Sequence, residues 1–212
     1  MKKQEEQLTE LKEIRQLMER SSRFLSLSGL AGLVVGAIAI TGVTAAYLYL
    51  GISPDSTKYY QWIGEPDGSL NPDFSNFLIA DVALVLFLSL FAGFWFAKTK
   101  AQKQGLPFWD ATAKRALINL AIPILAGAVY CFVLLYHGQL AFIAPATLIF
   151  YGLALLNTSK YTIDDIGYLG LWQLLLGLLA SFFIDYGLLI WAVGFGLLHM
   201  VYGLLIYNKY EK

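Results

Sequence analysis

His199 is the residue of this chain best suited to acid–base chemistry, and it lies inside a long apolar stretch. Histidine can take up and release a proton near neutral pH, and ionisable groups within a membrane mark functional sites by default. Further polar residues lie at comparable depth or somewhat nearer the same end of their own stretches: Ser28, Asn119, Tyr151, Gln173 and Tyr202. If these side chains converge, they form an inner polar pocket for a small solute or a proton, with His199 as the titrating group. The alternative is hydrogen bonding between helices, which contributes only about 0.6 kcal/mol per pair on average.

A second candidate is an outer polar site that pairs Asp81 with His137. Asp81 lies about one turn inside the outer edge of its apolar stretch, where its carboxylate could accept a hydrogen bond from His137, Thr41 or Thr44. The alternative is that Asp81 reaches the lipid headgroups, and the shallow depth favours this alternative.

Common catalytic motifs are absent from the sequence. It contains no H-E-x-x-H, H-x-x-E-H, G-x-S-x-G or P-loop pattern. The two histidines, His137 and His199, fall at different depths, so they cannot face one haem iron. Cys131 is the single cysteine, which excludes an internal disulfide framework and a cysteine-only metal cluster. We therefore predict no catalytic residue, no cofactor and no metal ion, and an enzyme is not favoured.

The elements that must position these residues are six apolar stretches. Of the chain, 58% is hydrophobic and 14% is charged, whereas ordinary globular domains carry about 25% charged residues. A helix that crosses a bilayer needs about 20 mostly apolar residues. Six segments qualify: 24–50, 77–97, 115–136, 139–157, 167–184 and 186–207. A soluble protein would need amphipathic helices to cover six apolar ones, and outside the short N-terminal segment the sequence has none. The sequence therefore predicts an all-α polytopic membrane protein, with a six-helix transmembrane domain over residues 24–208.

The distribution of positive charge predicts the orientation of these spans. With six spans, Lys58 is the only one of the 15 lysine and arginine residues that falls on the opposite side from the rest. Loops on the cytoplasmic side of a membrane carry an excess of lysine and arginine. We therefore expect both termini, and the long link at 98–114, to lie in the cytoplasm.

The segment before the first span, residues 1–23, predicts a cytoplasmic amphipathic helix. Leu11, Ile14 and Met18 fall on one stripe at helical spacing, and no proline or turn separates this segment from the first span. A cleavable signal has an apolar region of roughly 7–15 residues, which is shorter than the run found here. We expect a helix continuous with the first span. Its stripe could lie on the membrane surface, pack against the link 98–114, or pair with a second copy as a short coiled coil.

Small residues recur every four positions in the first two spans. They are Ser28, Gly32 and Gly36 in the first span, and Ser89 and Gly93 in the second. This spacing lets two helix backbones approach closely. We expect these helices to pack against neighbours within the bundle, and the alternative is a functional homodimer interface.

The ends of the later spans carry turn and capping signals. His137-Gly138-Gln139 and Asp185-Tyr186-Gly187 are short links, which predict antiparallel hairpins between the third and fourth spans and between the fifth and sixth. Thr162, followed three residues later by Asp165, predicts a capping box before the fifth span.

Three stretches carry a resemblance to a known family. They are IRQLMERSSRFLSLSGLAG at 14–32, SKYTIDDIGYLGLWQLLLGLL at 159–179 and DYGLLIWAVGFGLLHMVYG at 185–203. The chain resembles a family of small six-helix bacterial inner-membrane proteins of no known activity. This resemblance implies a bacterial cytoplasmic membrane location and brings no mechanism, cofactor or functional residue with it.

The expected function is that of a non-enzymatic membrane sensor or regulatory protein. In this hypothesis the N-terminal helix passes a change in bundle packing to a cytoplasmic protein partner. The alternative is a small-solute transporter or channel that acts as a dimer and uses the inner polar pocket. The lipid bilayer is an expected partner, and a net charge of zero argues against nucleic acid.

Overall fold

The computed structural model describes residues 28–51, 72–105 and 107–212 of the chain. The predicted helix at 1–23 and most of the outer link 51–76 lie outside the described residues. The longer helices are α2 (Gly29–Leu50), α3 (Pro72–Lys103), α4 (Ala111–Tyr136), α5 (Ile143–Thr158), α6 (Asp165–Phe182) and α8 (His199–Tyr210). Short helical turns join them: η2 (Leu140–Phe142), η3 (Ser159–Tyr161), η4 (Ile184–Tyr186), α7 (Gly187–Trp191) and the π-helical segment η5 (Ala192–Leu198).

Six helical segments in the described part of the chain are long and apolar enough to cross a membrane. They are Gly29–Leu50, Asn76–Lys103, Ala111–Tyr136, Leu140–Tyr161, Asp165–Phe182 and Ile184–Tyr210. The predicted fold class, a six-helix transmembrane bundle, is confirmed. The largest boundary differences are in the first span, which begins later than expected, and in the second, which runs on to Lys103.

The start of α2 corrects the expectation of one uninterrupted helix from the N-terminal segment into the first span. Ser28 precedes the helix with an extended backbone (φ −101°, ψ 131°), so the helix begins at Gly29. Its hydroxyl does not cap the helix, as its side chain makes no hydrogen bond to the first turn. The physical reason lies at the other end of the chain, because the amide of Gly29 is bonded by a distant carboxylate described below.

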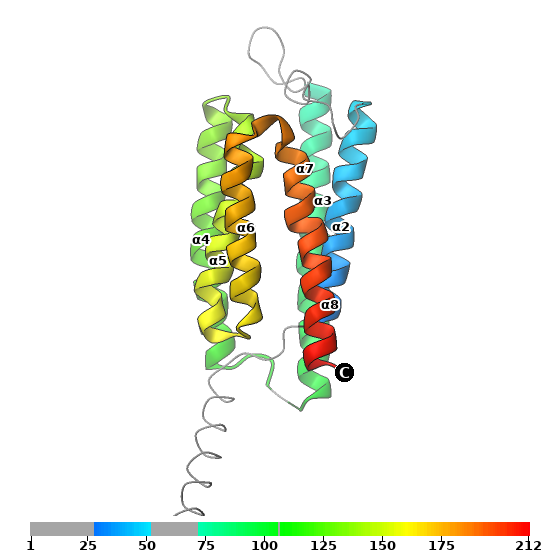
Figure 1. Cartoon of the computed structure of the whole chain (residues 1–212), viewed down its shortest axis with the longest axis vertical. Coiled ribbons are helices and arrows are strands. Elements are labelled where there is room, and N and C mark those ends of the chain that lie inside the picture. Colours follow the sequence, from blue (N-terminus) through cyan, green and yellow to red (C-terminus); the bar gives the residue numbers. More distant parts are fainter. Residues whose placement is uncertain (1–27, 52–71, 106) are drawn as a thin grey trace, which may run out of the picture.

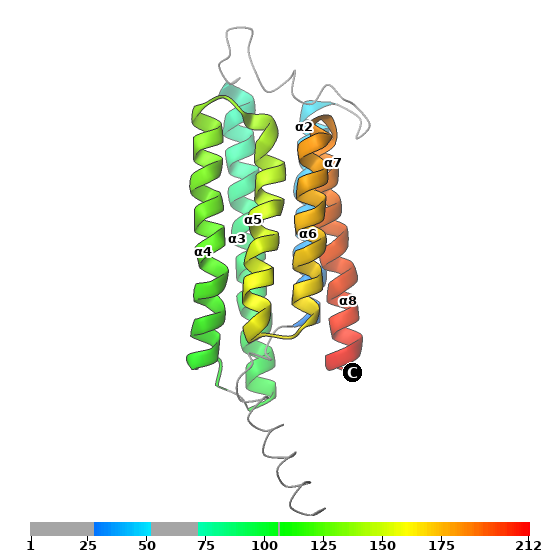
Figure 2. The ribbon, with the colours of Figure 1, turned by 60° about the vertical axis from the view of Figure 1, so that its left-hand side comes forward.

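The long helices run side by side along one direction (Figures 1 and 2), and their contacts divide them into two groups of three. In one group α5 packs between α4 and α6, and in the other α2 packs between α3 and the last span, formed by α7, η5 and α8. The groups meet where the last span contacts α5 and α6. The side chains of α5, α6 and the last span therefore provide the interior between the two groups.

Every lysine and arginine that the structure describes lies at one end of the bundle. This lysine-rich end comprises the end of α3, the start of α4, the turn between α5 and α6, and the end of α8, at the bottom of Figure 1. The segregation of charge matches the pattern from which the orientation was predicted.

Close backbone contact between α2 and the last span explains the small residues of the first span. A Cβ atom added to Gly32 would lie 2.9 Å from the Cα of Gly203, and one added to Gly36 would lie 2.5 Å from the carbonyl oxygen of Gly196. These glycines therefore let two helices of the same chain touch. In α3 a Cβ added to Gly93 meets nothing within 4 Å, and Ser89 is only partly buried. Gly93 thus makes no close helix contact within the described part of the chain.

The predicted capping box before the fifth span is wrong. The Thr162 hydroxyl donates back to the carbonyl of Thr158 at 3.4 Å. The Asp165 carboxylate instead accepts from Lys209 Nζ at 2.9 Å and from Tyr210 Oη at 2.8 Å. Asp165 therefore joins the start of α6 to the end of α8, because two strong donors of the last helix compete for its oxygens.

Candidate functional site

Three of the predicted inner polar residues meet in the interior of the bundle. Gln173 of α6 is fully buried and His199 of α8 is 5% exposed. The Tyr151 hydroxyl of α5 lies 3.0 Å from His199 Nε2, and Gln173 Nε2 lies 3.3 Å from His199 Nδ1. We call these three residues, together with the carbonyl of Gly194, the His199 cluster.

The carbonyl of Gly194 is the common acceptor of the His199 cluster. It lies in the π-helical segment, where a backbone hydrogen bond spans one residue more than in an α-helix. The oxygen accepts from Gln173 Nε2 at 2.8 Å and lies 3.1 Å from His199 Nδ1. A Cβ atom at position 194 would approach Gln173 Oε1 to 2.7 Å and Leu148 Cδ2 to 2.5 Å. The absence of a side chain at Gly194 therefore lets the Gln173 amide reach this carbonyl.

These contacts assign the protons of the His199 cluster. With the proton on Nδ1, His199 donates to the Gly194 oxygen and its Nε2 accepts from the Tyr151 hydroxyl. Gln173 Nε2 shares the Gly194 oxygen with Nδ1 as a second donor. Gln173 Oε1 remains without a hydrogen-bond partner although it is buried, and it is the only such side-chain atom among the described residues.

Aromatic rings enclose the His199 cluster on the side of the last span. The rings of Trp191, Phe195 and His199 lie in sequence along that span, with centroids 4.7 Å and 5.8 Å apart. Tyr151 contacts both Phe195 and His199, at 5.0 Å and 5.5 Å between ring centroids. Trp191 Nε1 donates to the Thr147 hydroxyl of α5 at 3.1 Å. The aromatic spacing of four residues was a signal for this arrangement in the sequence.

Asn119 does not join the His199 cluster and pairs instead with Asn157 of α5. Asn157 Nδ2 lies 3.0 Å from the backbone oxygen of Asn119 and 3.1 Å from its side-chain oxygen. Proline at position 123 has no N–H, so the carbonyl of Asn119 lacks its usual helical donor four residues on. The Asn157 amide supplies this donor from the neighbouring helix, which is how prolines are accommodated in transmembrane helices.

We expect Asn157→Leu to destabilise the bundle by about 1–2 kcal/mol, because it leaves the Asn119 carbonyl unpaired in an apolar setting. The same substitution in a Pro123→Ala background should cost less, since the alanine has a backbone N–H that can donate to that carbonyl. Free energies of unfolding in mixed micelles, measured for both single variants and the double variant, check this. Equal costs in the two backgrounds would show that Asn157 acts independently of the proline.

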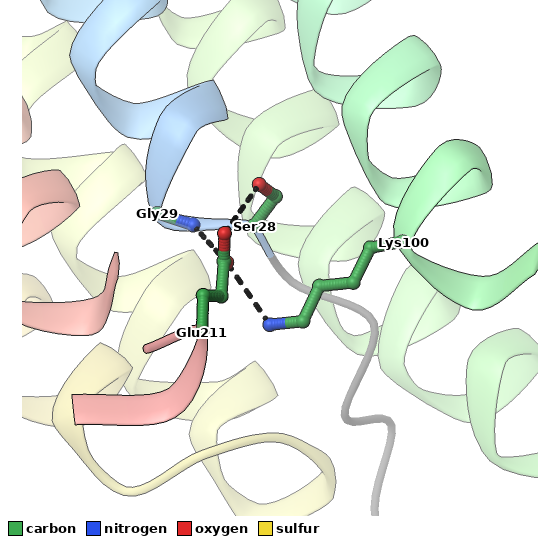
Figure 3. Close-up of polar contacts among 4 residues, drawn as sticks. All are labelled: Ser28, Gly29, Lys100 and Glu211. Carbon is green, nitrogen blue, oxygen red and sulfur yellow. Dashed lines mark hydrogen bonds and ion pairs between the residues drawn. The ribbon is translucent and has the colours of Figure 1, made fainter. Parts of the chain in front are cut away.

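Ser28, another predicted pocket residue, lies at the lysine-rich end beside Glu211 (Figure 3). The carboxylate of Glu211 accepts from the Gly29 amide at 2.7 Å, from Lys100 Nζ at 3.1 Å and from the Ser28 hydroxyl at 3.4 Å. The side chains of Lys100 and Glu211 are only 11% and 13% exposed. We call these four residues the Glu211 clasp, which joins the start of α2, the end of α3 and the end of α8.

Tyr202 makes no hydrogen bond with the His199 cluster in the described part of the chain. It packs, as Tyr151 also does, against an apolar group that contains Leu155, Leu169 and Ile206.

At the outer end, the carboxylate of Asp81 lies beside Gly42 of α2. The Thr41 and Thr44 hydroxyls donate to backbone carbonyls of α2 itself, and His137 is an exposed residue at the end of α4. Within the described ranges no hydrogen bond or ion pair joins Asp81 to His137, so the structure does not bring the predicted outer site together.

Glu211, Gly194 and Asn157 are the residues that sequence reasoning missed. Glu211 lies 183 positions from Ser28 in the chain, and no local pattern connects them. Asn157 could have been found, because a proline inside a span leaves a carbonyl that needs a donor from a neighbouring helix.

Comparisons with protein-family models, curated proteins and solved structures give no match to this chain. The resemblance to a family of small bacterial inner-membrane proteins therefore stays a prediction. The assignment of a role rests on the residues and geometry described above, which are those of a multi-pass membrane helical bundle.

Proposed function

We propose that this chain is a non-enzymatic regulatory protein or sensor of the bacterial cytoplasmic membrane. The lysine-rich end faces the cytoplasm in this proposal, which the segregation of charge supports. A reporter fused to the C-terminus and one inserted at the link between α3 and α4 should both be active in the cytoplasm. Activity of these two reporters on opposite sides would reject the orientation.

The observation that carries the regulatory role is the Glu211 clasp. One carboxylate holds three helix ends together, and it does so where the N-terminal segment enters the bundle. An ion pair that is mostly withdrawn from solvent depends on both partners being present. A change that moves Glu211 therefore releases the amide of Gly29 and the ammonium of Lys100 at the same time.

Release of the clasp would alter the packing of α2 against the last span. The two helices touch through glycine backbone atoms along Gly29, Gly32 and Gly36, so small rotations of one displace the other. The segment that precedes Ser28 is attached directly to this junction. We propose that a cytoplasmic partner bound to this segment responds to the state of the clasp.

The contacts of the His199 cluster favour this role over transport. A solute site would need polar atoms that are free to bind the solute. Tyr151 instead donates to His199, while His199 and the amide nitrogen of Gln173 both donate to the carbonyl of Gly194. Gln173 Oε1 is the one buried polar side-chain atom left without a hydrogen-bond partner among the described residues. The cluster therefore acts in this proposal as a polar lock between the two groups of helices.

The proposal is tested with Glu211→Gln and a truncation that removes residues 1–23. An amide at position 211 retains its size but loses the ion pair with Lys100, so we expect a stability loss of about 1–3 kcal/mol. Asp165→Asn is the matched control, because its ion pair with Lys209 is more exposed to solvent and should contribute much less to stability than the pair in the Glu211 clasp.

Site-specific cross-linking in intact cells then measures the association with cytoplasmic proteins. We expect Glu211→Gln to change the cross-linked products and Asp165→Asn to leave them unchanged, while truncation abolishes them. Identical products from the truncated protein and the full chain would reject the regulatory role of the N-terminal segment.

A further inference from the structure

The charges at the lysine-rich end are not evenly paired. On the side formed by α6 and α8, Asp165 binds Lys209, and Glu211 binds Lys100 of α3. Asp110, at the start of α4, uses its carboxylate to cap that helix through the amide of Ala113 at 2.6 Å. The acidic groups of these three contacts are therefore already bonded to other parts of the chain.

Four cations on the other side have no counterion among the described residues. They flank the connection between α3 and α4: Lys98, Lys103, Lys114 and Arg115. All four side chains are exposed, and none forms a hydrogen bond or ion pair in the part of the chain that the structure describes. This basic turn therefore presents positive charge that no described carboxylate pairs with, beside the ends of two transmembrane helices.

Aromatic side chains lie at the same level as the basic turn. Phe108 of the connection packs edge-on against Phe94 of α3 at 5.3 Å between centroids, which folds the connection back onto the helix. Trp109, next to Phe108, is 57% exposed, and Trp95 of α3 is 59% exposed. Tryptophan prefers the headgroup level of a bilayer, where its ring is half in apolar surroundings and its N–H meets polar groups.

The helices that leave the basic turn expose apolar faces continuous with it. α3 packs mainly on α2, and α4 packs mainly on α5, so neither helix is a main partner of the other. Large side chains near the turn are more than half exposed on α3, as in Phe94 at 55%, and on α4, as in Ile118 at 57% and Ile122 at 61%. This surface suits hydrocarbon chains whose headgroup lies at the basic turn.

We propose that the basic turn and the adjoining faces of α3 and α4 form a binding site for an anionic phospholipid. The phosphate lies among Lys98, Lys103, Lys114 and Arg115, the indoles of Trp95 and Trp109 lie beside the headgroup, and the acyl chains lie along α3 and α4. A lipid fits this surface better than an acidic protein does. The cations lie directly beside an apolar surface that extends along two membrane-spanning helices. Each cation near an anionic bilayer surface contributes to such binding.

The test compares Lys103→Gln/Lys114→Gln with Lys160→Gln/Lys212→Gln. Both variants lose two exposed lysines from the lysine-rich end, but only the first pair flanks the basic turn. The full chain is placed in nanodiscs of phosphatidylcholine with a defined share of phosphatidylglycerol, and bound lipid is counted by native mass spectrometry after release. We expect selective retention of phosphatidylglycerol by the unmodified protein and the control, and a reduction of roughly 10- to 30-fold in affinity for the first variant.

Three results would overturn this proposal. The first is equal retention of phosphatidylglycerol and phosphatidylcholine by the unmodified protein. The second is retention of phosphatidylglycerol that appears only after residues 1–23 are removed, because the glutamates of the N-terminal segment would then occupy the basic turn in the full chain. The third is an equal reduction in both double variants, since general charge and not this site would then hold the lipid. The regulatory role proposed above is independent of all these outcomes.

Discussion

Gly203→Ala is expected to destabilise the bundle by about 3 kcal/mol or more, although it adds a single methyl group. A Cβ at this position would lie 2.6 Å from the backbone nitrogen of Leu33 and 2.7 Å from the carbonyl oxygen of Gly29. Both are backbone atoms, so no flexible side chain can yield, and α2 and α8 must separate. Inserting a methyl group into a well-packed site costs typically 1–3 kcal/mol, and more where backbones must shift.

The chain supplies a matched control at Gly93. A Cβ added there meets nothing within 4 Å, and alanine is a better helix former than glycine by about 1 kcal/mol. We therefore expect Gly93→Ala to be neutral or stabilising. The thermal midpoint of each purified variant in the same detergent, followed by tryptophan fluorescence, gives the comparison. Similar midpoints for Gly203→Ala and Gly93→Ala would mean that α2 and α8 are not in backbone contact.

The spacing of small residues predicts that another helix can approach closely, but it does not identify that helix. Gly32 and Gly93 sit in similar patterns in the sequence, yet only Gly32 has a backbone against it. The backbone against Gly32 is that of Gly203, which lies in the last span, far from Gly32 in the sequence. Single-sequence patterns carry no information on such long-range pairing, whereas hydropathy, which depends on local composition, predicted all six spans.

Depth along a span predicts the level of a polar residue but not the direction in which it points. Tyr151, Gln173 and His199 share a level and also face one another. Asn119 points instead toward Asn157, because Pro123 leaves a carbonyl there to be satisfied. The rotation of each helix depends on the packing of whole faces, and these spans are apolar on all sides, so periodicity gives little guidance.

The start of α2 depends on a contact from the far end of the chain. No proline lies between residues 18 and 40, and a Ser-Gly pair such as Ser28-Gly29 suits a helix start or a turn. The helix begins at Gly29, whose free amide is bound by the Glu211 carboxylate. A carboxylate at a helix N-terminus is favourable because the unpaired N–H groups and the helix dipole both attract it.

The second large effect is expected at His199. It is tested by whether the effect of Tyr151→Phe on the free energy of unfolding changes sign when His199 is replaced. His199→Phe keeps a ring in place but removes both nitrogens, so the Tyr151 hydroxyl loses its acceptor and Gly194 loses one of its two donors. We expect a loss of about 2–3 kcal/mol, because an unpaired buried hydroxyl is costly where water does not reach. Tyr151→Phe alone should cost about 1 kcal/mol, since it leaves Nε2 of His199 without a donor.

In the His199→Phe background, however, Tyr151→Phe should restore stability, because it removes the hydroxyl that has lost its partner. Tyr130→Phe is the control: its ring contacts Phe150 at 5.7 Å, its side chain is 47% exposed, and its hydroxyl should contribute nothing in either background. Free energies of unfolding of the unmodified protein, the two single variants and the double variant, measured in mixed micelles, complete the cycle. A cost for Tyr151→Phe that is the same with and without His199 would show that the hydroxyl and the imidazole are not coupled. The polar lock between the two groups of helices would then rest on the 2.8 Å hydrogen bond from Gln173 of α6 to the carbonyl of Gly194 in the last span.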